Sequence, residues 1–94
     1  METSQWTREE LMTFLKEYIK SGVRTTEEFS SNSKGGVWVS GEDMSEYQGD
    51  VIYDYYAESS LYEFGVLVEF ESILQQHGWY SEWYDAGTVM IYPE

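Results

Sequence analysis

The order of apolar patterns along the chain is what most constrains its fold. A helical stripe in residues 7–21 is followed by two runs rich in β-branched and aromatic residues, and the same order returns after about residue 60. Apolar residues three or four positions apart mark one face of a helix, whereas alternation at every second residue marks a strand. The chain therefore predicts the order helix, strand, strand, helix, strand, strand.

The first helix has a start and a stop signal. Thr7-Arg8-Glu9-Glu10 fits a capping box, in which the Thr7 hydroxyl accepts from the amide of Glu10 and the Glu10 carboxylate accepts from the amide of Thr7. Gly22 suits the left-handed residue that ends a helix. We predict a helix over residues 7–21, with one apolar stripe made of Leu11, Phe14, Leu15, Tyr18 and Ile19.

The next segment predicts a loop and two strands. Residues 30–36 are rich in serine and glycine, which is typical of a flexible loop. Residues 37–39 and 50–56 have the β-branched and aromatic content of strands. Because only an acidic connection separates the two runs, we expect them to pair as a hairpin with a long loop.

A second helix and a second hairpin complete the pattern. Ser60 and Glu63 fit a capping box, but Gly65 weakens the first turn, so regular helix is expected from near Phe64 until the stop signal at Gly78. Residues 79–84 and 88–92 then alternate as two strands. A three-residue connection that ends in Gly87 favours a type I turn closed by a glycine bulge.

These elements predict a single α+β domain over residues 1–94. Two helices would pack on one face of a four-stranded, mostly antiparallel sheet, in the order α-β-β-α-β-β. The 94 residues include 41% hydrophobic and 18% aromatic residues, which is enough for a core despite the high charge. The opposite face of the sheet would meet water or a partner.

The charge is unevenly distributed along the chain. Eighteen acidic and five basic residues give a net charge of −13, and all five bases lie within the first 34 residues. Residues 35–94 carry twelve acids and no lysine or arginine. Since repulsion between like charges destabilises a compact chain, folding does not require this arrangement. We therefore expect the negative charge to serve a partner outside the chain.

Several classes of protein are excluded by what the sequence lacks. There is no cysteine, which excludes disulfides and thiolate chemistry. No apolar run is long enough to span a membrane, and no signal segment begins the chain, so a cytoplasmic protein without membrane contact is the expectation. A net charge of −13 with no basic stripe would repel phosphates, which argues against direct binding of nucleic acid.

No catalytic, cofactor or metal site is predicted. The single histidine, His77, stands where a helix should end, and a cap is the simplest role for it. Residues 43–54 have the length of a calcium-binding EF-hand loop, but Gln48 replaces the turn glycine and Asp54 replaces the final glutamate. Two neighbouring carboxylates could cleave glycosides, yet chance brings such pairs together among eighteen acids. We expect a protein that is not an enzyme.

Acids and tyrosines are interleaved in the acidic part of the chain. Tyrosine and tryptophan supply stiff, amphipathic contact area and are enriched at interface hot spots. We predict that a rigid surface of carboxylates and aromatic rings binds a basic protein. The candidate partner-binding residues are Glu42, Asp43, Glu46, Asp50, Asp54, Tyr56, Glu58, Glu82, Tyr84 and Asp85.

In size, charge and aromatic content, the whole chain resembles the small, very acidic inhibitors that phages and mobile elements make against host defence or DNA-processing proteins. Anti-CRISPR proteins, anti-restriction DNA mimics and inhibitors of uracil-DNA glycosylase belong to this class. The resemblance implies an inhibitor that occupies the basic nucleic-acid-binding surface of a host protein, in the cytoplasm of the host cell. It assigns no role to any single residue.

Other functions fit the same charge. An immunity-type protein that neutralises a basic toxin would use the same physical device against a different target. An acidic subunit or assembly factor would pair with a basic protein. A halophile-type housekeeping domain would use its acids to hold water and salt, although such proteins spread charge evenly and reduce large aromatics. A tyrosine-rich sheet edge also allows a homodimer.

Overall fold

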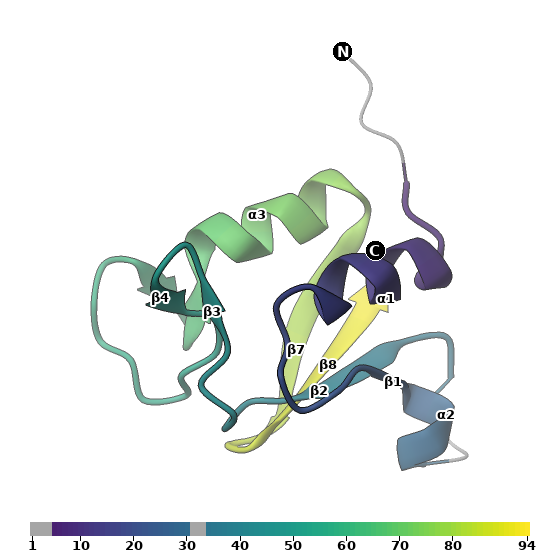
Figure 1. The fold of residues 1–94 in the computed structure, drawn as a ribbon, viewed down its shortest axis with the longest axis horizontal. Helices are drawn as coiled ribbons and strands as arrows, with labels where there is room; N and C mark the ends of the chain where they lie inside the picture. Colours follow the sequence, from purple (N-terminus) through teal and green to yellow (C-terminus); the bar gives the residue numbers. More distant parts are fainter. Residues whose placement is uncertain (1–4, 31–33) are drawn as a thin grey trace.

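The centre of the fold is an antiparallel four-stranded sheet with the order β1-β2-β8-β7 (Figure 1). The computed structural model describes residues 5–30 and 34–94. The sheet comprises β1 (Arg24–Thr25), β2 (Val37–Ser40), β7 (Trp79–Asp85) and β8 (Thr88–Pro93). The α+β class and the four-stranded antiparallel sheet are confirmed.

The remaining elements differ in number and order from the prediction. The described residues form three helices, α1 (Arg8–Lys16), α2 (Thr26–Phe29) and α3 (Val68–Gln76). Two small antiparallel ribbons lie outside the main sheet: β3 (Glu46–Tyr47) pairs with β4 (Asp50–Val51), and β5 (Tyr62–Glu63) pairs with β6 (Val66–Leu67). The predicted order with two helices and four strands is therefore wrong in detail.

The core lies between the sheet and helices α1 and α3. Phe70 of α3 is fully buried, and its ring packs against the rings of Phe14, Tyr18, Tyr47 and Tyr53 at centroid distances of 5.5 to 6.4 Å. Strands β2 and β8 supply the sheet side, and the helices supply the other. The buried core includes Val37, Val39, Val89 and Ile91 from the sheet and Leu11, Leu15 and Leu74 from the helices.

The capping box of α1 is confirmed. The amide of Glu10 donates to Thr7 Oγ1 at 3.2 Å, and the amide of Thr7 donates to the Glu10 carboxylate at 2.9 Å. The helix ends at Lys16, however, five residues before the predicted end. Thr7 and Glu10 lie within four residues of each other, so the sequence alone predicts this helix start.

Tertiary hydrogen bonds explain the early end of α1. The amide of Lys20 donates to Ser45 Oγ at 2.9 Å, and the amide of Ser21 donates to Asp43 Oδ2 at 3.0 Å. In a longer helix these amides would donate to carbonyls four residues earlier. Side chains from a distant loop take that place, so the helical spacing of Tyr18 and Ile19 does not continue the helix.

The predicted strand over residues 50–56 is reduced to β4. Its partner is β3, while β2 pairs with β1 on one side and β8 on the other. Ile52 and Tyr53 are both buried, so the segment does not alternate between a core face and a solvent face. The predicted hairpin between residues 37–39 and 50–56 is therefore wrong, although β2 itself is confirmed.

The predicted start of the second helix is also wrong. Helix α3 begins at Val68, and the preceding residues form the β5–β6 hairpin. Phe64 and Gly65 make its turn with φ angles of 52° and 76°. Two successive left-handed residues suit a two-residue hairpin turn and cannot continue a right-handed helix. Glu63 lies in β5, so the Ser60–Glu63 capping box does not exist.

Gly65 should tolerate substitution less well than Gly49, which has a similarly left-handed φ of 90°. A Cβ at Gly65 would lie 2.8 Å from the Asp54 carbonyl oxygen and 2.9 Å from Tyr55 Cα, whereas nothing lies within 4 Å at Gly49. We expect Gly49→Ala to cost about 1 kcal/mol of unfolding free energy and Gly65→Ala about 1–3 kcal/mol more. Urea denaturation of both variants measures this, and equal losses would contradict it.

The C-terminal hairpin is confirmed, but its turn differs from the prediction. Asp85 pairs with Thr88, and the register shifts between Trp83 and Asp85. The bulge residue is therefore Tyr84. Gly87, the predicted bulge residue, has no left-handed φ. The Asp85 carboxylate accepts from the amide of Gly87 at 2.9 Å and so stabilises the turn from within.

Helix α2 lies just before the predicted loop, in a segment for which no helix was predicted. The amide of Thr25 donates to the Glu28 carboxylate at 3.0 Å, in the reciprocal arrangement of a capping box. The amide of Gly36 donates to Thr26 Oγ1 at 3.1 Å, which ties the far end of the predicted flexible loop to this helix. Residues 31–33 of that loop lie outside the described residues.

Candidate partner-binding surface

Loop 41–45 crosses the end of the β7–β8 hairpin and carries Glu42 onto its turn. The amide of Gly41 donates to the carbonyl of Gly87 at 2.9 Å. The Glu42 carboxylate lies over Gly87, where a Cβ would collide with it. Asp85 belongs to the same turn. Two carboxylates separated by 43 positions in the sequence are thus placed at one end of the sheet.

Trp83 joins this turn to a second acidic segment. The ring of Tyr55 packs against Trp83 at 5.1 Å between centroids, and a Cβ at Gly41 would overlap the same tryptophan. The indole Nε1 donates to the carbonyl of Phe64 at 2.6 Å, which holds the ring in place. Asp54 precedes Tyr55, and its carboxylate accepts from the amide of Tyr56 at 3.2 Å.

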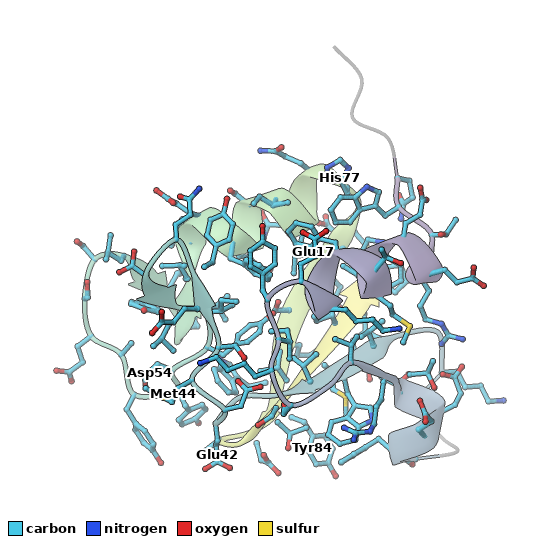
Figure 2. The ribbon with its side chains drawn as sticks, viewed as in Figure 1. Glu17, Glu42, Met44, Asp54, His77 and Tyr84 are labelled. Atoms are coloured by element: carbon cyan, nitrogen blue, oxygen red, sulfur yellow. The ribbon has the colours of Figure 1, made fainter. Side chains whose placement is uncertain are left out.

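We define the acidic edge as the surface of Glu42, Met44, Asp54, Tyr55, Tyr56, Tyr84 and Asp85. Figure 2 shows its four labelled members, Asp54, Met44, Glu42 and Tyr84, along one border of the molecule, away from Glu17 and His77. Its apolar members are unusually open: Tyr56 is 77% exposed, Tyr84 60% and Met44 55%. Large exposed side chains grouped in this way are typical of interaction sites.

Five of the ten predicted site residues lie on the acidic edge, namely Glu42, Asp54, Tyr56, Tyr84 and Asp85. Glu46 and Asp50 are exposed on the β3–β4 ribbon, and Glu58 is exposed in the loop that follows Ala57. Glu82 is exposed on the face of β7 that pairs with Met90, turned away from the core.

Asp43 has a structural role that the sequence did not indicate. Its carboxylate accepts from the hydroxyls of Ser21 and Ser45 at 2.6 and 2.7 Å, and from both amides at 3.0 Å. Partial burial opposes ionisation of Asp43, but these serine hydrogen bonds outweigh it and lower its pKa. Asp43 therefore fastens loop 41–45 to the residues after α1.

Two residues of the acidic edge, Met44 and Tyr55, were not among the predicted site residues. Met44 has a left-handed φ of 57°, which turns this apolar side chain outward next to Glu42. In the predicted strand over residues 50–56, Tyr53 and Tyr55 would share one face, but Tyr53 is buried while Tyr55 is 47% exposed. Neighbouring acids were the only signal in the sequence for either residue, and many other residues share it.

No carboxylate of residues 35–94 forms an ion pair with a described base. Within residues 5–30 and 34–94 the only ion pair is Arg8–Glu27 at 2.7 Å, and it lies in the N-terminal third of the chain. Arg24 lies over the ring of Trp38 at 5.3 Å. Partial burial raises the pKa of the Tyr62 phenol, and the carboxylates of Asp50 and Asp54 raise it further. Residues 35–94 therefore carry twelve acids that no ion pair with a described base neutralises.

His77 is the C-cap residue of α3, as its position predicted, and its ring stacks on Trp6 at a centroid distance of 3.9 Å. Across the described ranges, no three histidine, aspartate or glutamate side chains gather as a metal site. None of the helices in that part of the chain could cross a membrane.

Comparison with known proteins finds no match to this chain among family models, curated proteins or solved structures.

Proposed function

We propose that this protein is a non-enzymatic inhibitor that covers the basic, nucleic-acid-binding surface of a partner protein with its acidic edge. One observation carries the proposal: carboxylates and exposed aromatic rings share the edge, and no ion pair engages these carboxylates in the described chain. A basic groove that normally holds phosphates would offer the missing counter-charges.

Electrostatics favours a partner over simple solvation. Surface charges of one sign attract an oppositely charged protein over a Debye length, about 10 Å at 0.1 M salt. They speed association more than they strengthen the final complex. The exposed rings of Tyr55, Tyr56 and Tyr84 would supply the buried contact area that charge alone does not. A solvation surface needs carboxylates but has no use for exposed tyrosines among them.

The first test is capture of the partner from a bacterial lysate on the immobilised protein at about 0.05 M salt. We expect one dominant nucleic-acid-binding protein, which elutes in a salt gradient and is displaced by competing DNA or RNA. Capture of a toxin that nucleic acid does not displace would indicate an immunity protein instead. A broad set of basic proteins would mean that the charge is generic and would contradict the proposal.

Charge reversal then tests the acidic edge itself. With the captured partner, Glu42→Lys combined with Asp54→Lys should slow association by at least about tenfold at low salt, and far less at about 0.5 M. The matched control is Glu9→Lys in α1 combined with Glu17→Lys at its C-cap, which changes the net charge equally. Surface plasmon resonance measures the association rates of both double variants. Equal slowing by both would mean that the acidic edge is not the binding surface.

A further inference from the structure

A pocket of about 350 Å³ lies between helix α3 and strand β7. Its lining includes four apolar or aromatic residues and two acids, namely Phe64, Val68, Tyr80, Trp83, Glu63 and Glu71. Neither acid is among the predicted site residues. Phe64 of the β5–β6 turn lines the pocket and is 87% exposed.

Glu71 brings an incompletely satisfied carboxylate to this pocket. Its Oε2 accepts from the amide of Ser81 at 3.0 Å, whereas its Oε1 is screened from solvent and has no hydrogen-bond partner among the described residues. Burial raises the pKa of Glu71 despite the hydrogen bonds that favour its ionised form. A buried carboxylate oxygen without a donor is costly, so a cation beside it would be favourable.

The side chains that line the pocket indicate which kind of ligand it would bind. Aromatic residues and carboxylates together suit a cation that is also flat and apolar on its faces, because it can stack on a ring while it donates hydrogen bonds from its rim. An arginine guanidinium has this form, whereas a lysine ammonium is a compact and strongly hydrated charge. The last torsion of a glutamate is broad, so Glu71 can turn Oε1 toward an incoming donor.

We propose that this pocket is an anchor site for an arginine side chain of the basic partner, with Glu71 as its counter-charge. The inference rests on the proposed function for the identity of the occupant. It adds a specific contact to the general attraction of the acidic edge, since a single buried side chain fixes the register of two surfaces. Trp83 connects the pocket with the acidic edge, because it lines the pocket and packs against Tyr55 of the edge.

The pocket can be tested without the partner by titration with N-acetylarginine amide. We expect NMR shifts at the Ser81 amide and the Trp83 indole N–H with millimolar affinity. The citrulline analogue, which has the same shape but no charge, should bind at least tenfold more weakly. Equal shifts from both compounds, or shifts away from these two groups, would overturn the proposal.

Variants test the role of Glu71. Glu71→Gln should weaken arginine binding at least tenfold, while Glu69→Gln on the exposed face of α3 should leave it unchanged. If Glu71→Gln does not fold, Val68→Lys provides a second test, because Val68 is 42% exposed and a lysine there would place a competing cation at the pocket. Undiminished arginine binding in Val68→Lys or in folded Glu71→Gln would overturn the site.

Partner capture separates this inference from the proposed function. Loss of capture by Glu71→Gln and by the Glu42→Lys/Asp54→Lys pair supports both. Full capture by Glu71→Gln, with loss by the charge-reversal pair, overturns the anchor and leaves the proposed function standing. Arginine binding that depends on Glu71, with no captured partner, supports the pocket and overturns the proposed function.

Discussion

Replacing Phe70 by alanine should destabilise the protein by about 3–5 kcal/mol, the range found when a buried phenylalanine is truncated in a packed core. Phe70 is fully buried and contacts rings from three other parts of the chain, including Phe14 of α1, Tyr47 of β3 and Tyr53 after β4. Its loss leaves a cavity where these segments meet. Urea denaturation followed by tryptophan fluorescence measures the change in unfolding free energy.

Phe64→Ala is the matched control for this prediction. The same side chain is removed, but Phe64 is 87% exposed, so we expect a change within about 0.5 kcal/mol. A loss of similar size in both variants would mean that Phe70 is not the centre of the core.

Replacing Asp43 by alanine should cost on the order of 2 kcal/mol, because it leaves the amides of Ser21 and Ser45 without their acceptor. Glu42→Ala next to it should change stability little, since the Glu42 side chain is exposed. Loop 41–45 should also loosen in the Asp43 variant, which hydrogen exchange at the Ser45 amide would detect. Equal stability of the two variants would contradict the role assigned to Asp43.

The same contact predicts a pH dependence. The folded-state pKa of Asp43 lies below the ordinary aspartate value of 3.8, so its ionised form stabilises the fold above that pH. This contribution disappears as pH falls through the folded pKa. The difference in unfolding free energy between the protein and Asp43→Asn should therefore be constant above about pH 5 and shrink below about pH 4. A difference that does not change between these values would contradict the lowered pKa.

The sequence predicted only part of the candidate site. A run of acids marks the region after Glu42, but residue type does not distinguish Asp43 from its neighbour. Asp43 is committed to the fold because Ser21 and Ser45 surround its carboxylate, and Ser21 lies 22 positions away. Nothing in the sequence sets Glu71 apart from the other acids, whereas the packing of α3 on β7 buries its Oε1 beside a pocket.

The pairing of strands could not be predicted from local sequence patterns either. Arg24–Thr25 forms the edge strand β1, yet a segment of two residues is too short to show the alternation that predicts a strand. Residues 50–56 carry a strong signal and stay outside the sheet, because β1 and β8 occupy both edges of β2. Competition for an edge depends on every strand at once, and no local pattern records it.

By itself, the sequence determines the features that depend on residues within a few positions of one another. The Thr7–Glu10 capping box, strand β2 and the β7–β8 hairpin are such features, and so is the segregation of charge. Only the tertiary structure decides where α1 ends, which strands flank β2, and which carboxylates remain open to a partner. Those outcomes depend on hydrogen bonds and burial between residues far apart in the chain, which form only when the whole core packs.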